Sequence, residues 1–255
     1  MILKGHLFSQ TLEMETGISI LSSDKMGDEP HKAVYLLHGL CGRSGDWLDY
    51  TMLPAYANEY NAIFIMPEVA RSFYSDMKSG PKYFTYVTEE LPKICKKTFN
   101  ISEDRNDTFI IGASMGGYGA LKCALSKPGQ YGTCCAFASP CLFLKNDLQR
   151  CGGALKFKEM YGDSLFRDFQ AIFGESMHLN PGDDVLELAE DNAENPDKPR
   201  IYMSCGKEDR LLDDNKKYYG LLKDLDYDIE FEELDGNHNW QYFNEALERA
   251  LNHCF

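Results

Sequence analysis

The sequence lacks the apolar stretches that membrane proteins need. In its 255 residues no apolar run approaches the roughly 20 residues required to cross a bilayer as a helix. Residues 1–6 also lack the basic segment, the long apolar segment and the small-residue cleavage site of a secretory signal peptide. We therefore expect a cytoplasmic protein that does not associate with a membrane.

Positive charge is scarce as well. The chain has 26 Lys and Arg against 40 Asp and Glu, which gives a formal net charge of −14. A surface with this charge repels phosphate backbones and anionic lipids. Nucleic acid is therefore not an expected partner, and a polyanionic substrate is disfavoured unless a local basic patch binds it.

Metal-binding and disulfide motifs are absent too. The nine cysteines include no C-x-x-C pair, and no H-E-x-x-H motif occurs. The number of cysteines is odd, and Cys134 and Cys135 are adjacent in a strand-like run. We expect buried, reduced thiols, and we expect no metal and no cofactor.

Apolar strands and helical segments alternate along most of the chain. This order is typical of right-handed β-α-β crossovers, which produce a mostly parallel central sheet with helices on both faces. The length suits a single α/β domain, 1–255. The predicted strands are 18–21, 33–37, 62–66, 109–111, 133–138, 200–205 and 228–234, and the predicted helices include 47–60, 83–99, 118–125, 164–173, 216–225 and the C-terminal segment.

The pattern changes between residues 141 and 199. This stretch has helical pieces but no convincing buried strand, and its acidic, proline-containing end leads back to the sheet. Long excursions from a regular alternation are more often functional covers than structureless loops. We predict a lid-like helical insertion over the strand ends.

The stretch 108–119, TFIIGASMGGYG, contains the pattern G-x-S-x-G centred on Ser114. Such a pattern also occurs by chance, but here an apolar strand precedes it and an apolar helical segment follows it. This is the context of a nucleophile elbow, a tight strand-to-helix turn that exposes a serine hydroxyl. Gly112 and Gly116 allow neighbouring backbone to approach the turn. We predict that Ser114 is a nucleophile.

A catalytic serine needs a base and a group that orients the base. His238 follows the last predicted strand in a glycine-containing loop, which is where we expect the base. His38 ends a strand, where we expect a structural role. The other histidines are assigned to less suitable places: His6 before the sheet, His31 in a turn, His178 in the insertion and His253 near the C-terminus.

The orienting carboxylate is expected after the strand at 200–205. Asp209 follows the strand end closely, with Gly206 before it, and Glu208 is its main competitor. Asp213 and Asp214 are typical of residues that cap the next helix. The predicted triad runs in the chain order of α/β-hydrolases: Ser114, Asp209, His238.

A second glycine-containing turn, residues 38–42, follows the strand at 33–37. Backbone N–H groups in such a turn can hold the negative oxygen of a tetrahedral intermediate. We predict an oxyanion hole made by the N–H groups of Leu40 and Met115.

Several motifs stand in order along most of the chain: His38-Gly-Leu40 with Trp47, Arg71-Ser-Phe-Tyr-Ser-Asp76, Phe84-Thr-Tyr-Val with Glu90-Leu-Pro92, Gly112-Ala-Ser-Met-Gly-Gly117, Cys205-Gly-Lys-Glu-Asp209 and Gly236-Asn-His-Asn-Trp240. Together they resemble the esterase D and tributyrin esterase group, which includes S-formylglutathione hydrolases and feruloyl or acetyl-xylan esterases. The resemblance implies the α/β-hydrolase fold, the triad named above and oxyanion donors at Leu40 and Met115. Arg210 stands where we would expect an apolar residue.

The predicted activity is hydrolysis of short-chain acyl or aryl esters through an acyl-enzyme on Ser114. Three alternatives stay open: a thioesterase of the S-formylglutathione hydrolase type, an acyltransferase, and a non-catalytic binding protein with a hydrolase fold. The expected partner is a small-molecule ester or thioester, and homo-oligomerisation is left open. Trp47 and Tyr74 are predicted to line the substrate pocket.

Overall fold

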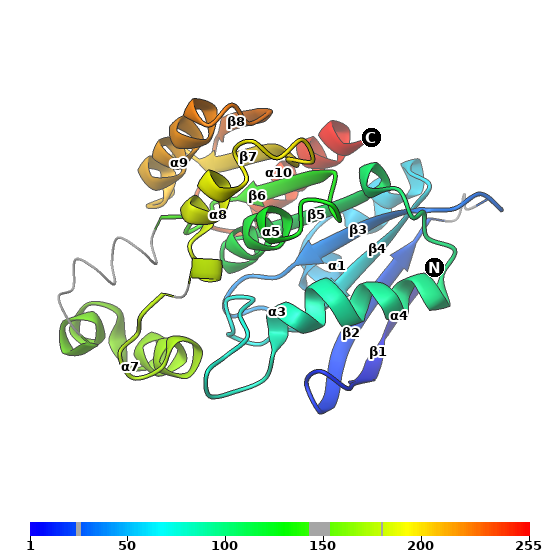
Figure 1. Ribbon diagram of the computed structural model, residues 1–255. Coiled ribbons are helices and arrows are strands. Elements are labelled where there is room, and N and C mark those ends of the chain that lie inside the picture. The colour runs from blue at the N-terminus through cyan, green and yellow to red at the C-terminus, as the bar shows by residue number, and fades with distance from the viewer. Residues whose placement is uncertain (24–26, 143–153, 180) are drawn as a thin grey trace.

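Eight strands form one sheet in the order β1-β2-β4-β3-β5-β6-β7-β8 (Figure 1). The computed structural model describes residues 1–23, 27–142, 154–179 and 181–255. The β1–β2 and β2–β4 pairs are antiparallel, and every other pair in the sheet is parallel. The strands are β1 (Ile2–Ser9), β2 (Met14–Ser22), β3 (Lys32–Leu37), β4 (Ala62–Pro67), β5 (Thr108–Ala113), β6 (Thr133–Phe137), β7 (Arg200–Gly206) and β8 (Ile229–Leu234).

Helices cover both faces of this sheet, which confirms the predicted α/β-hydrolase architecture. The longer helices are α1 (Asp46–Tyr50), α4 (Leu91–Thr98), α5 (Met115–Ser126), α7 (Ala154–Phe173), α8 (Val185–Asp191), α9 (Leu212–Asp224) and α10 (Trp240–Cys254). Short turns of helix complete the set: α2 (Leu53–Tyr56), α3 (Tyr83–Thr85), η1 (Ala57–Glu59), the π-helical η2 (Tyr86–Glu90), η3 (Arg105–Asp107) and η4 (Pro181–Asp183).

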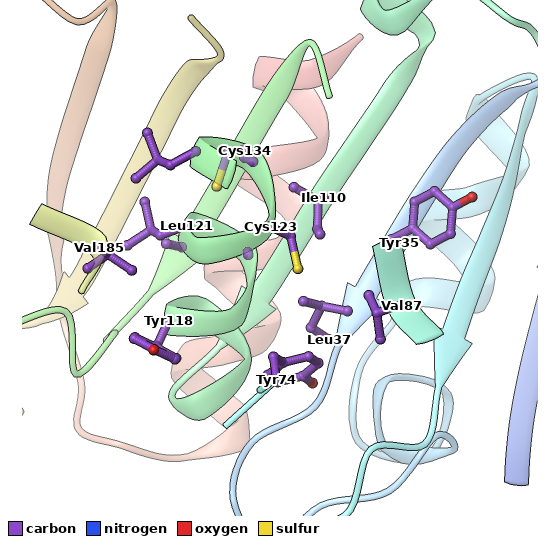
Figure 2. Close-up of a cluster of buried hydrophobic side chains, with 14 of the residues drawn as sticks. Tyr35, Leu37, Tyr74, Val87, Ile110, Tyr118, Leu121, Cys123, Cys134 and Val185 are labelled. Carbon is purple, nitrogen blue, oxygen red and sulfur yellow. The ribbon is translucent and has the colours of Figure 1, made fainter. Parts of the chain in front are cut away.

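The central strands are apolar throughout because both of their faces are buried. In β3, Val34 and Leu36 pack with α1, α2 and α10, whereas Tyr35 and Leu37 pack on the opposite face with α4, α5 and α8. Figure 2 shows the cluster that contains Tyr35 and Leu37, in which Cys123 of α5 lies beside Ile110 of β5 and Leu121 of α5 lies beside Val185 of α8. The strand ends are therefore held between two well-filled layers.

The N-terminal hairpin contains a strand that the sequence analysis did not predict. We expected the first strand at 18–21, but residues 2–9 also form an edge strand, β1, paired along its length with β2. Seven of the eight residues of β1 are exposed or only partly buried, so this strand lacks the continuous apolar run that is typical of a central strand. His6 consequently lies within the sheet and not before it.

We predicted helical structure at 47–60 with a break or a new first turn at Pro54, and the structure confirms the new first turn. The structure has two short helices here, α1 and α2, and Pro54 lies in the first turn of α2. A proline is tolerated at this place because the first turn of a helix does not use its backbone N–H. The break itself lies just before this turn, at Thr51, whose backbone is extended.

The described part of the predicted insertion, 154–179 and 181–199, contains helices and no strand. One buried ion pair attaches it to the body of the molecule: Lys122 of α5 donates to Asp183 of η4 and also to Ser75, at 2.7 Å from its hydroxyl oxygen. Both charged side chains are at most 8% exposed. The end of the insertion is therefore attached directly to the helix that follows Ser114.

Eight cysteines lie in the described part of the chain, and none of these eight forms a disulfide. Seven are buried as expected, but Cys41 is exposed. No helix within the described ranges is both long enough and apolar enough to cross a membrane.

Candidate active site

Ser114 occupies the sharp turn between β5 and α5. Its backbone has φ 55° and ψ −121°, a conformation that costs a non-glycine residue about 1–3 kcal/mol. The turn is held from both sides, because the Ser114 N–H donates to the Phe137 carbonyl at 2.8 Å and the Gly117 N–H donates to the Ser114 carbonyl at 2.9 Å. This is the geometry of a nucleophile elbow.

Close backbone contacts explain the two glycines of the motif. A Cβ atom on Gly112 would lie 2.0 Å from the Gly116 carbonyl oxygen, and one on Gly116 would lie 2.2 Å from the Leu37 carbonyl oxygen. Both contacts are with backbone, which cannot move aside as a flexible side chain can. The elbow therefore requires glycine at both positions.

His238 and Asp209 meet after the ends of two adjacent strands. The His238 Nδ1 and the Asp209 Oδ2 are 2.6 Å apart, and the Asp209 side chain is fully buried whereas that of His238 is 30% exposed. The edge of the His238 ring packs on Phe243 at a centroid distance of 5.2 Å. The histidine is thus fixed on one side and open to solvent on the other.

The Asp209 carboxylate is kept ionised by its hydrogen bonds. Burial acts to raise its pKa, but the bonds from His238 and from the Leu211 N–H, with the charge of Arg210 nearby, lower the pKa below its ordinary value. The Leu211 N–H lies 2.9 Å from Oδ1 and His238 lies on Oδ2, so each oxygen accepts one bond. A charged carboxylate here holds the His238 ring with Nδ1–H as donor.

The competing carboxylates do not contact His238. Glu208 is exposed, and its N–H donates to the Gly236 carbonyl, which joins the two loops that carry Asp209 and His238. Asp214 accepts a hydrogen bond from the Leu142 N–H. Asp213 lies in the first turn of α9 without a capping bond, so our interpretation of Asp213 and Asp214 as caps is wrong.

Ser114 and His238 both line a cleft of about 710 Å³, which we call the Ser114 cleft. A smaller adjoining pocket of about 80 Å³, the small pocket, also reaches Ser114. The Ser114 cleft is lined by Gly39, Leu40, Cys41, Gly42, Arg43, Asp46, Tyr50, Ala113, Ser114, Arg210, His238, Asn239, Trp240 and Phe243. The small pocket is lined by Leu40, Phe73, Ser114, Met115, Pro140, Tyr161, Leu165, Arg210 and Leu211.

The turn after β3 lies against the elbow. A Cβ on Gly39 would be in ordinary contact with the Ser114 Cβ, at 3.5 Å, and Leu40 and Met115 share the small pocket with Ser114. His38 stabilises the turn, since its Nδ1 lies 2.8 Å from the Gly39 carbonyl oxygen while its Nε2 accepts from the Val69 N–H at 3.1 Å. With both nitrogens bonded to backbone, His38 has a structural role.

Trp47 and Tyr74 do not line either cavity, which corrects our prediction. Both side chains are fully buried. The Trp47 Nε1–H donates to the Leu37 carbonyl at 3.3 Å, and the Tyr74 hydroxyl donates to the His38 carbonyl at 2.9 Å (Tyr74 and Leu37 are seen in Figure 2). These large aromatics fill the core beneath the site and support the backbone of the turn after β3.

The walls of the small pocket include residues that the sequence did not reveal. Tyr161 and Leu165 come from α7, inside the predicted insertion, and Phe73 comes from the loop after β4. Phe73 belongs to the motif Arg71-Ser-Phe-Tyr-Ser-Asp76, and this motif is the one feature of the sequence that could have identified it as a pocket residue. No periodicity indicates which side chains of α7 face the pocket.

No group of three or more His, Cys, Asp or Glu in the described residues is arranged to hold a metal ion. The reactive groups at this edge of the sheet are instead a hydroxyl, an imidazole and a carboxylate. Such a set is suited to acyl transfer through a serine.

Comparison with known proteins agrees with this geometry. Residues 9–254 match the Esterase family. An acetyl esterase of Caldicellulosiruptor saccharolyticus is 30% identical over 266 residues, covering 98% of this chain and 96% of that protein.

Two solved structures from Staphylococcus aureus cover all of this chain and 98% of their own. A fluorophosphonate-binding serine hydrolase F superposes with a TM-score of 0.85 at 26% identity, and an S-formylglutathione hydrolase superposes with a TM-score of 0.83 at 27% identity. The chain therefore belongs to the Esterase family, within the esterase D-like group, and is a serine carboxylic ester hydrolase with the α/β-hydrolase fold.

Proposed function

We propose that this member of the Esterase family hydrolyses short-chain acyl or aryl esters through an acyl-enzyme on Ser114. One observation carries the proposal: the serine at the strained elbow shares a cleft with His238, and His238 is held by the buried carboxylate of Asp209. A nucleophile, a base and a group that orients the base are thus gathered at one edge of the sheet.

In the proposed reaction, the Nε2 of His238 takes the Ser114 proton as Oγ attacks the ester carbonyl carbon. The N–H groups of Leu40 and Met115 stabilise the resulting oxyanion. The tetrahedral intermediate collapses, His238 protonates the departing alcohol, and the acyl group stays on Ser114. Water then attacks the acyl-enzyme with His238 as base, which releases the acid and restores the Ser114 hydroxyl. Asp209 stabilises the imidazolium without taking its proton.

The two cavities support a short acyl group. The small pocket measures about 80 Å³ and its walls are mostly apolar, whereas the Ser114 cleft measures about 710 Å³. A small acyl group fits the former, and the latter has room for a larger leaving group.

The same cavities support the assignment of residues 141–199 as a cover within a single domain, 1–255. Tyr161 and Leu165 of α7 form part of the wall of the small pocket. Arg71 attaches α7 to the loop after β4, since its Nε and Nη2 donate to Asp168 at 2.9 and 2.7 Å. The described helices of this segment thus close one side of the proposed acyl site.

Labelling with a fluorophosphonate, followed by peptide mapping, tests the proposal. The expected result is a stoichiometric adduct on Ser114 that is lost in Ser114→Ala and in His238→Ala. Ser139→Ala is a useful control, because Ser139 is a fully buried serine outside both cavities. A folded protein that is not labelled would favour a non-catalytic binding protein, and an adduct on another serine would contradict the assignment.

A thioester is the main alternative substrate, because an S-formylglutathione hydrolase superposes along the whole chain. Measuring kcat/KM for acetyl, butyryl and feruloyl esters and for matching acyl thioesters decides between them. A strong preference for thioesters would overturn the proposed ester specificity. Supplying an alcohol and measuring the transesterified product tests acyl transfer.

A further inference from the structure

Arg210 stands at the junction of the two cavities around Ser114. It follows Asp209 directly in the turn between β7 and α9, and it lines both the Ser114 cleft and the small pocket. Its side chain is exposed. No other residue of the described chain except Leu40 and Ser114 belongs to both cavity walls.

The guanidinium of Arg210 has no hydrogen bond or ion pair with the described residues. The other charged groups of the Ser114 cleft neutralise one another: the Arg43 Nε lies 3.4 Å from Asp46, and Arg43 Nη2 lies 3.1 Å from Asp49. In the small pocket Arg210 is the one charged residue among those lining it. A positive charge thus lines both cavities beside Ser114, and the Asp46 carboxylate on the wall of the Ser114 cleft is paired with Arg43.

This arrangement is unusual for a chain with a net charge of −14. A guanidinium offers paired N–H donors that match the two oxygens of a carboxylate. The carboxylate that precedes Arg210 in the chain, Asp209, is already occupied by His238 and the Leu211 N–H. A carboxylate of the substrate is therefore the group that complements Arg210.

On the basis of the proposed esterase function, we propose that Arg210 selects substrates whose leaving group carries a carboxylate. The carboxylate belongs to the leaving group because the small pocket, at about 80 Å³, has room for a short acyl group only. The larger Ser114 cleft holds the leaving group, and the guanidinium at its edge binds the anionic end. The substrate class is a short-chain acyl ester or thioester of an acidic alcohol, phenol or thiol.

Two acetyl esters that differ in the charge of the leaving group test this inference. They are 4-acetoxybenzoate, with a carboxylate, and 4-acetoxybenzamide, with a neutral amide in its place. The measured quantity is the ratio of their kcat/KM values, since a ratio between variants cancels the intrinsic reactivity of each ester.

Replacing Arg210 by Leu is expected to lower the anionic-to-neutral ratio about tenfold, the order expected for loss of a charge-assisted hydrogen bond at a partly exposed site. Arg210→Lys keeps the charge and should retain most of the ratio. Lys207→Leu is the matched control, because Lys207 is a nearby exposed cation that pairs with Asp235 and lines neither cavity. The wild-type ratio should also fall as salt is added.

A merely local effect of Arg210 on Asp209 gives a different result. Both esters would then lose kcat/KM together and the ratio would not change, which would overturn the inference. If the wild type hydrolyses neither ester, the proposed function fails by itself. Calorimetric binding of 4-acetoxybenzoate to Ser114→Ala, with and without Arg210→Leu, then decides the inference without turnover, and equal affinities would contradict it.

Discussion

The elbow and the small pocket lie side by side at Ser114, yet they are specified in different ways. At the elbow, the identity of each residue follows from backbone geometry: Gly112 and Gly116 have no room for a Cβ, and Ser114 holds φ 55°. The walls of the pocket come from loops and a helix that are distant in the chain, such as Leu165 of α7.

This difference indicates where amino-acid substitutions are tolerated. Elbow residues are held by contacts with main-chain atoms that cannot shift, so substitution there breaks the fold or the chemistry. Pocket residues line open space, so substitution there alters the shape of the cavity. Substrate preference can therefore vary while the reaction is retained.

The largest effect on catalysis is expected for Asp209, the residue that we propose orients the base. Asp209→Asn should lower kcat by about 10³- to 10⁴-fold, because an amide favours the wrong tautomer of His238. Steady-state kinetics on 4-nitrophenyl acetate measures the change. Glu208→Gln is the control, since Glu208 is exposed and does not contact His238. A mild effect of Asp209→Asn beside a large effect of Glu208→Gln would reverse the assignment.

Breaking the elbow backbone should cost stability. In Gly112→Ala the new Cβ would lie 2.0 Å from the Gly116 carbonyl oxygen, so we expect the free energy of unfolding to fall by at least about 3 kcal/mol. Urea denaturation followed by circular dichroism measures it. Gly129→Ala, at an exposed position with no atom within 4 Å of the added carbon, should have little effect. Equal stabilities of the two variants would contradict the argument.

The attachment of the insertion to α5 should also be costly to break. Lys122→Met removes the cation of the buried pair and leaves the Asp183 charge buried without that cation, which is expected to lower the free energy of unfolding by about 3 kcal/mol. Lys207→Met, which removes an exposed pair with Asp235, should leave the unfolding midpoint unchanged. If both variants unfold at the wild-type midpoint, the buried pair is not a significant anchor.

A substitution in the small pocket should change the selectivity for acyl-chain length. Leu165→Ala enlarges the small pocket, so the ratio of kcat/KM for hexanoyl over acetyl esters should rise about tenfold. Leu155→Ala is the matched control, because Leu155 lies in the first part of α7, before the non-helical Gly162, with 78% of its surface exposed. A change in overall rate without a change in this ratio would show that Leu165 does not limit acyl length.

The smallest effect is the contribution of Asp209 to stability in acid. Its pKa is lower in the folded chain than its ordinary value of about 3.9, so the stabilisation is complete above that pH and is lost as pH falls through the folded pKa. The stability of the wild type should therefore decline toward that of Asp209→Asn below about pH 4. Urea denaturation of both proteins at several pH values measures the difference, and a gap that widens in acid would contradict the shift.

Much of the fold was predictable because its central strands are buried on both faces. Continuous apolar runs located β3 to β7, and the alternation of strands with helices implied parallel pairing. Edge strand β1 carries mostly exposed side chains, so hydrophobicity did not reveal it. Its partner β2 was predicted only at 18–21, near its buried end, and the pairing of the two strands is decided when the chain folds back on itself.

By itself the sequence predicted the elbow, the chain order of the proposed serine, acid and base, and the turn after β3. These are short segments in which local backbone constraints select the residue types, glycine above all. Only the tertiary structure decided that Trp47 and Tyr74 fill the core, that Leu165 lines the small pocket beside Ser114, and that Arg210 lines both cavities. The physical reason is that the environment of a side chain is set by elements packed from distant parts of the chain, and no local pattern records that packing.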